Sequence, residues 1–191
     1  GSGIVTVATK VTVATAGTMH ATCVSFGDIG ILLRGPSGAG KSDLALRLID
    51  AGATLVADDQ VRLTVDDGVL CASPPAELAG LLELRGVGLA RLPFVSGVSI
   101  CLVADLVRCG VAERLPVEDW EICSGVRVRR VEIAPFEQTA VAKLRIAAYD
   151  ASGRNDPVTG ARLHGEGRHD EGSHDEGREY EEGPVNDRDA G

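Results

Sequence analysis

The chain of 191 residues has room for one domain of ordinary size, with or without a tail. It is 44% hydrophobic and 25% charged, and its net charge of −9 excludes the basic surface of a typical nucleic-acid-binding protein. No apolar run approaches the ~20 residues of a membrane span, and the five cysteines include no C-x-x-C pair. We therefore expect a cytoplasmic protein that has neither nucleic acid nor a membrane as its partner.

Apolar periodicity predicts the elements in chain order. Val and Thr alternate over residues 4–16 in a strand-like pattern, and the turn Asp66-Asp67-Gly68 predicts a hairpin. Leu44, Leu48 and their neighbours share one face at helical spacing before Gly52. The strands expected are 21–26, 29–34, 54–57, 60–65, 69–72, 98–106 and 126–133, and the helices are 41–51, 77–84 and 138–149. This order predicts an α/β fold with helices packed on a sheet.

Composition divides the chain into three parts. Residues 1–18 are expected to form an N-terminal extension or an extra strand, and 19–150 the folded domain. Residues 151–191 hold 5 Arg and 11 Asp or Glu among many glycines, which predicts an acidic, disordered tail. Its histidines, His164, His169 and His174, leave open weak binding of a divalent metal.

A phosphate-binding motif lies between the strand 29–34 and the helix 41–51. The sequence G-x-x-x-x-G-K-[ST] predicts a glycine-rich loop whose N–H groups point at a phosphate, with the helix N-terminus behind it. The lysine is expected to reach the β- and γ-phosphates, and the serine hydroxyl to ligate Mg²⁺. The residues of the motif are Gly35, Pro36, Ser37, Gly38, Ala39, Gly40, Lys41 and Ser42.

Acidic residues downstream complete a candidate phosphotransfer site. Asp58 and Asp59 end the strand 54–57, so we expect them at the carboxyl edge of the sheet beside the loop, where one carboxylate holds Mg²⁺ through water and another accepts a proton. Glu83 is either a surface acid or a further oxygen ligand of Mg²⁺. By local pattern alone, His20 is a structural histidine and Arg114 a surface cation.

Together these segments resemble the C-terminal catalytic domain of the bacterial HPr kinase/phosphorylase family. The resemblance extends from about residue 19 to 148 and includes His20-Ala-Thr, the phosphate-binding motif, Leu55-Val-Ala-Asp-Asp59, Ser73-Pro-Pro75 and Leu82-Glu-Leu-Arg-Gly-Val-Gly88. It implies a P-loop kinase domain with a mixed β-sheet flanked by helices, related to the nucleotide-binding core of phosphoenolpyruvate carboxykinase. The compact form looks like the short alphaproteobacterial members of the family.

The resemblance also implies an activity and roles for the residues. Family members phosphorylate a serine of the phosphocarrier protein HPr with ATP and Mg²⁺, as part of phosphotransferase-system regulation, and many reverse the reaction. Asp59 would be the base, Ser42 and Glu83 would hold Mg²⁺, and Lys41 the phosphates. His20 and Arg114 would complete the catalytic site, and the protein would assemble as a homo-oligomer, a hexamer in the family.

The sequence differs from the longer family members in two ways, and these differences leave part of the implied activity and assembly open. Residues 134–140 read Ala-Pro-Phe-Glu-Gln-Thr-Ala, without the Gly-Arg-Asn of longer members, so the phosphorylase reaction and the hexamer remain open. We expect this compact form to lack the N-terminal domain of the longer members, and with it one route of regulation. The alternatives to an HPr kinase are a P-loop kinase of a small metabolite and a nucleotide-binding sensor that docks a partner without catalysis.

Overall fold

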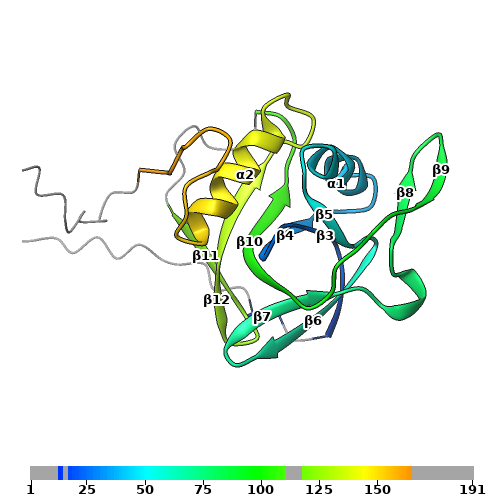
Figure 1. The fold of residues 1–191 in the computed structure, drawn as a ribbon, viewed down its shortest axis with the longest axis horizontal. Coiled ribbons are helices and arrows are strands. Elements are labelled where there is room, and N and C mark those ends of the chain that lie inside the picture. Colours follow the sequence, from blue (N-terminus) through cyan, green and yellow to red (C-terminus); the bar gives the residue numbers. More distant parts are fainter. Residues whose placement is uncertain (1–12, 15–16, 111–117, 165–191) are drawn as a thin grey trace, which may run out of the picture.

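A computed structural model describes residues 13–14, 17–110 and 118–164 of the chain (Figure 1). These residues form twelve strands, two α-helices and one short 3₁₀ helix. The strands are β1 (Val13–Ala14), β2 (Gly17–His20), β3 (Thr22–Phe26), β4 (Ile29–Arg34), β5 (Thr54–Ala57), β6 (Gln60–Asp66), β7 (Val69–Ser73), β8 (Leu81–Leu84), β9 (Gly88–Arg91), β10 (Val98–Leu106), β11 (Asp119–Cys123) and β12 (Val126–Ile133). The helices are α1 (Lys41–Asp50), α2 (Ala140–Ala151) and the 3₁₀ helix Ala76–Leu78.

The main sheet is mixed, as the family resemblance implies. Its central path runs β1-β11-β12-β10-β4-β3-β5. β10 pairs in parallel with β4 and β12, whereas β3 is antiparallel to both β4 and β5. Because β3 runs against both of its neighbours, β4 and β5 point the same way and their carboxyl ends share one edge. Asp58 and Asp59, which follow β5, therefore lie at the carboxyl edge of the sheet as predicted. β3 lies between β5 and β4, the strand that precedes the glycine-rich loop.

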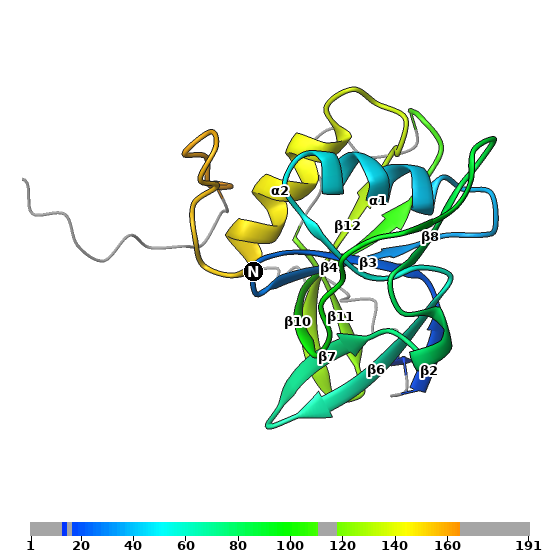
Figure 2. The ribbon, with the colours of Figure 1, turned by 45° about the vertical axis from the view of Figure 1, so that its right-hand side comes forward.

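Both faces of this sheet are covered. Alternate residues of β4 point to opposite faces, so Ile31 and Leu33 pack with Leu44 of α1 and Leu144 of α2, while Leu32 packs in a second cluster with residues of β6 and β7. Figures 1 and 2 show α1 and α2 on one side and the β6–β7 hairpin with β2 on the other. A strand buried on both faces has a continuous apolar sequence, which explains the run Ile29–Leu33.

Two regions of the fold differ from the sequence-based expectation. The helix expected at 77–84 is wrong, because only Ala76–Leu78 is helical and Leu81–Leu84 forms β8, which pairs with β9 in a separate two-stranded sheet. This hairpin projects from the body beside α1 (Figure 1). β11 was not expected, and it joins β12 on one side and β1 on the other.

The chain stays attached to α2 beyond residue 151. Arg145 of α2 donates a 2.7 Å hydrogen bond to Asp156, whose side chain is fully buried. Residues 165–191, with His169 and His174, lie outside the described residues, so the three-part division of the chain stays a proposal. No helix in the described ranges is both long and apolar enough to cross a membrane.

Candidate active site

The glycine-rich loop connects β4 to α1 and is built for an anion. Gly38 and Gly40 have φ angles of 80° and 101°, which residues with a side chain rarely adopt. Within the described part of the chain, the N–H groups of Gly38, Gly40, Lys41 and Ser42 donate to no backbone carbonyl. Free N–H groups at a helix N-terminus are the usual partners of a bound phosphate. The loop therefore fits the phosphate cradle predicted from the motif.

Lys41 supplies a cation inside this loop. Its side chain is only 7% exposed, and its Nζ donates to the carbonyl oxygens of Gly35 at 2.7 Å and Pro36 at 3.0 Å. Burial lowers the pKa of the ammonium group, and the Asp58 and Asp59 carboxylates oppose that shift. The ammonium group is thus held over the loop by weak carbonyl partners, which a phosphate can replace with a stronger, charge-assisted one.

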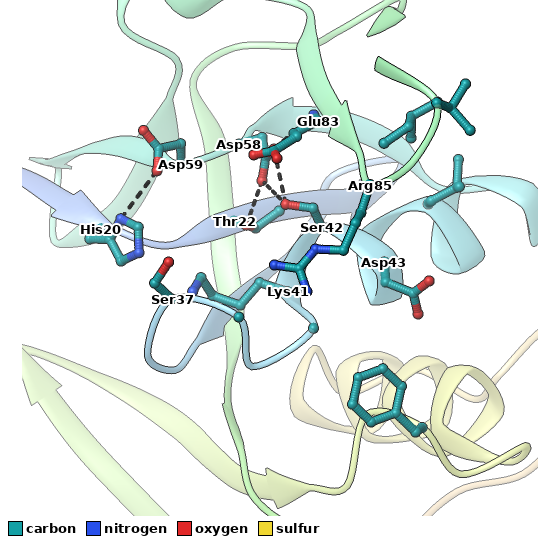
Figure 3. A pocket seen from close by; sticks show the side chains of 16 residues that line it. His20, Thr22, Ser37, Lys41, Ser42, Asp43, Asp58, Asp59, Glu83 and Arg85 are labelled. Carbon is teal, nitrogen blue, oxygen red and sulfur yellow. Dashed lines mark hydrogen bonds and ion pairs between the residues drawn. The ribbon is translucent and has the colours of Figure 1, made fainter. Parts of the chain in front are cut away.

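Asp58 links three elements around the loop. It is 6% exposed and accepts hydrogen bonds from Thr22 Oγ1 of β3 at 2.7 Å and from Ser42 Oγ of α1 at 2.9 Å. The backbone N–H of Glu83, on β8, donates to its other oxygen at 3.2 Å. Figure 3 shows this carboxylate between Thr22, Ser42 and Glu83. The sequence places Asp58 at the site, but only the structure identifies it as the group that orients the Ser42 hydroxyl.

Asp59 points away from Asp58 and toward solvent. Its backbone is left-handed, with φ of 67°, so consecutive carboxylates face different ways. The Asp59 side chain is 64% exposed, and its Oδ1 lies 3.3 Å from Nδ1 of His20 at the end of β2 (Figure 3). An accessible carboxylate held beside a phosphate cradle is suited to accept a proton from an incoming hydroxyl.

One pocket of about 430 Å³ joins these groups. Of the residues predicted from the sequence, it is lined by His20, Ser37, Gly38, Gly40, Lys41, Ser42, Asp58, Asp59 and Glu83. Gly35, Pro36 and Ala39 belong to the same loop but do not line the pocket, and Arg114 lies outside the described residues. The lining also includes Thr22, Asp43, Leu46, Leu84, Arg85, Val87 and Phe136.

The donors in this pocket suit Mg²⁺. Within the described ranges no three His, Cys, Asp or Glu side chains come together as a metal-binding group. Mg²⁺ in phosphotransfer sites uses only one or two protein ligands and takes its others from phosphates and water. The Ser42 hydroxyl and the Glu83 carboxylate, brought to the same pocket by their contacts with Asp58, fit that requirement.

The fold and the site together define a P-loop domain of the kinase type. A family model described as the HPr Serine kinase C-terminal domain matches residues 11–111. That range is more than half of the 191 residues, and the chain belongs to this family.

Individual relatives agree with the family. The HPr kinase/phosphorylase of Clostridium tetani is 42% identical over 103 residues, which are 54% of this chain and 32% of that protein. The HPr kinase/phosphorylase of Bordetella pertussis is 35% identical over 150 residues, covering 72% of this chain and 47% of the relative. The chain thus spans between about a third and a half of these curated relatives.

A solved structure agrees as well. The HPr(Ser) kinase/phosphatase from Coxiella burnetii superposes with a TM-score of 0.60 at 26% identity, over 66% of this chain and 90% of that one. The P-loop kinase fold and the family expected from the sequence are confirmed. The roles of the individual residues, the homo-oligomer and the cytoplasmic location stay predictions.

Proposed function

We propose that this chain is an ATP- and Mg²⁺-dependent serine kinase of the phosphocarrier protein HPr. The observation that supports this most directly is the exposed Asp59 carboxylate at the mouth of a pocket whose floor is a P-loop. A pure nucleotide sensor needs the loop but has no need of an accessible base beside it. The relatives are named as HPr kinases, and this supplies the acceptor.

In this proposal the loop and Lys41 hold the phosphates of ATP. The N–H groups of the loop and the Lys41 ammonium group neutralise charge on the β- and γ-phosphates, and Ser42 and Glu83 hold Mg²⁺. Bound Mg²⁺ supplies charge neutralisation at the transferring phosphoryl group. Asp58 keeps the Ser42 hydroxyl in place through the 2.9 Å hydrogen bond.

Asp59 accepts the proton of the serine hydroxyl. Its backbone geometry turns the carboxylate out of the Asp58 cluster, and His20 at 3.3 Å restricts its orientation. The serine oxygen then forms a bond to the γ-phosphorus as the bond to the leaving ADP oxygen breaks, and the proton goes to Asp59.

The test is transfer of label from γ-labelled ATP to purified HPr with Mg²⁺, alongside HPr whose acceptor serine is alanine. Label is expected on the first and not on the second. Asp59→Asn keeps a residue that tolerates the left-handed backbone and is expected to slow transfer by about 100- to 10,000-fold without changing ATP affinity. Asp67→Asn is the matched control, because Asp67 is also exposed and left-handed, with φ of 47°, but lies in the β6–β7 turn.

Two results would contradict the proposal in different ways. ATP binding without label on HPr would exclude the HPr kinase and favour the sensor or a kinase of a metabolite. Full transfer by Asp59→Asn would leave the kinase in place but exclude Asp59 as the base.

A further inference from the structure

Phe136 is an exposed aromatic side chain at the rim of the pocket. It is 72% exposed, and it lines the pocket as its largest apolar side chain. The loop around it is tied down, since the Arg47 guanidinium group of α1 donates to the carbonyl oxygen of Pro135 and the N–H of Ala140 donates to Glu137 at 3.1 Å. Single exposed apolar residues are common, but one that is held at the rim of a ligand pocket calls for a ligand-based explanation.

The ring lies directly on the glycine-rich loop. A Cβ atom built at Gly40 would come within 2.8 Å of the Phe136 Cζ atom, closer than real Cβ contacts. Gly40 is also the residue immediately before α1, with φ of 101°. Phe136 therefore contacts the last glycine of the loop, next to the N–H groups that would hold the phosphates.

The fold places Phe136 on a ligand-binding edge. It follows β12, which is parallel to β10, and β10 is parallel to β4, so the carboxyl ends of these strands lie at the same edge as the loop. Ligands of open α/β sheets bind outside these ends. Figure 3 shows α2, the yellow helix that follows Phe136, on the side of the loop away from His20 and Asp59.

The chemistry of the pocket differs from side to side. His20 and Asp59 lie at the end where the acceptor hydroxyl is expected, and Glu83 and Arg85 form a second polar side (Figure 3). The apolar side chains that line the pocket are Leu46, Leu84, Val87 and Phe136. Among the described residues of the lining, Phe136 is the aromatic one, so it is the side chain that can stack on a nucleobase whose phosphates lie on the loop.

We propose that Phe136 is the stacking platform for the base of the bound nucleotide. The proposal rests on ATP being the phosphate donor and adds the residue that holds its adenine. Stacking on an aromatic ring tolerates any base, because every base has a π-face. The enzyme therefore binds GTP nearly as well as ATP but prefers both over inorganic tripolyphosphate, which has the phosphates without the base.

The test is equilibrium binding of Mg·ATP and Mg·tripolyphosphate by the full chain. Phe136→Ala is expected to weaken ATP binding by about tenfold and to leave tripolyphosphate binding unchanged. Phe136→Tyr keeps the ring and is expected to restore wild-type affinity for ATP. Val158→Ala is the control, because Val158 is exposed to the same degree, 70%, and does not line the pocket.

A second readout comes from Phe136→Trp. This variant retains stacking, and its new tryptophan fluorescence is expected to be quenched by ATP and not by tripolyphosphate, relative to wild type with its single tryptophan. Equal losses for ATP and tripolyphosphate in Phe136→Ala, or unchanged ATP affinity together with a raised KM for HPr, would overturn the proposal. Failure of the wild type to bind ATP would instead overturn the proposed function.

Discussion

Two polar clusters flank the end of β4, and they differ in how their charges are paired. On one side, Arg34 donates to Asp105 at 2.7 Å and to Glu121 at 2.7 Å, and Arg130 donates to Asp105 at 2.6 Å. This ion-pair network joins β4, β10, β11 and β12. Glu121 is 1% exposed, and Arg34 is its ion-pair partner. Burial raises the pKa of Asp105, but Arg34 and Arg130 outweigh it and lower that pKa.

The pocket side pairs its carboxylates with weaker partners. Within the described residues, Asp58 accepts from hydroxyl and N–H groups and forms no ion pair, and the ion pair of Asp59 is with His20. Here the buried cation Lys41 donates to carbonyl oxygens. A network of matched ions fixes strands, whereas carboxylates and an ammonium group without strong partners retain the capacity to bind a charged ligand. Variants on the two sides should therefore fail in different assays.

Breaking the ion-pair network should give the largest effect, and it should appear in stability. Arg34→Met leaves Glu121 and one oxygen of Asp105 without their cation and is expected to lower the free energy of unfolding by about 3–5 kcal/mol. Urea unfolding at neutral pH measures this loss. Arg62→Met is the control, because Arg62 is exposed on β6. A loss no larger than in the control would mean that Arg130 alone satisfies the network.

Replacing Lys41, the cation of the pocket, should lower activity and leave stability nearly unchanged. Lys41→Met preserves the apolar stem and is expected to slow phosphoryl transfer by about 100- to 1,000-fold, with little change in unfolding free energy because burial already disfavours the charge. Label transfer and urea unfolding on the same samples test both statements. Lys143→Met, which removes an exposed lysine paired with Glu137, serves as the control. A large loss of stability in Lys41→Met would contradict the contrast between the two clusters.

Asp58 and Asp59 are adjacent in the sequence, but their replacement should affect stability differently. Asp58→Ala leaves the Thr22 hydroxyl and the Glu83 N–H without their acceptor, which is expected to cost about 1–3 kcal/mol of stability. Asp59→Asn is expected to change stability by less than about 0.5 kcal/mol, as for other exposed positions. Thermal unfolding of both variants decides this. Equal destabilisation would show that Asp59 has a structural role.

The elements that could be predicted from the sequence are those specified locally. β4, the glycine-rich loop and α1 follow from a contiguous apolar run, a motif and helical spacing. The expected helix at 77–84 failed because Leu81 and Leu82 belong to a strand whose partner follows a turn at Gly86, with φ of 81°. Pairing with β9 makes residues 81–84 a strand, and the spacing of the leucines does not encode that pairing.

The site was predicted as a set of residues but not as an arrangement. β11 forms a hairpin with β12 across the left-handed residues Ser124 and Gly125, a local turn that could have predicted this strand. Its other pairing, Val13 of β1 with Ile122, joins residues about a hundred positions apart and leaves no local signal. The hydrogen bonds of Asp58 span 16 to 36 positions, so neither its burial nor its control of Ser42 could be read from the Asp58-Asp59 pair. Phe136 reaches the pocket because β12, β10 and β4 are parallel, so the segment after β12 lies at the same edge of the sheet as the loop after β4.

The smallest effect should come from the ion pair between Arg145 of α2 and Asp156. Burial raises the pKa of Asp156, but hydrogen bonds from Arg145 and Thr159 outweigh it and lower the pKa from 3.8 to about 2. Because the folded-state pKa is depressed, the stabilisation is present above the unfolded value and is lost as the pH falls from 3.8 toward about 2. The difference in urea midpoint between wild type and Asp156→Asn should therefore shrink across that window. Asp43→Asn, which alters an exposed i,i+4 pair with Arg47, should show no comparable change. A constant difference for Asp156→Asn would mean that the Thr159 hydrogen bonds, and not the charge of Asp156, provide the stabilisation.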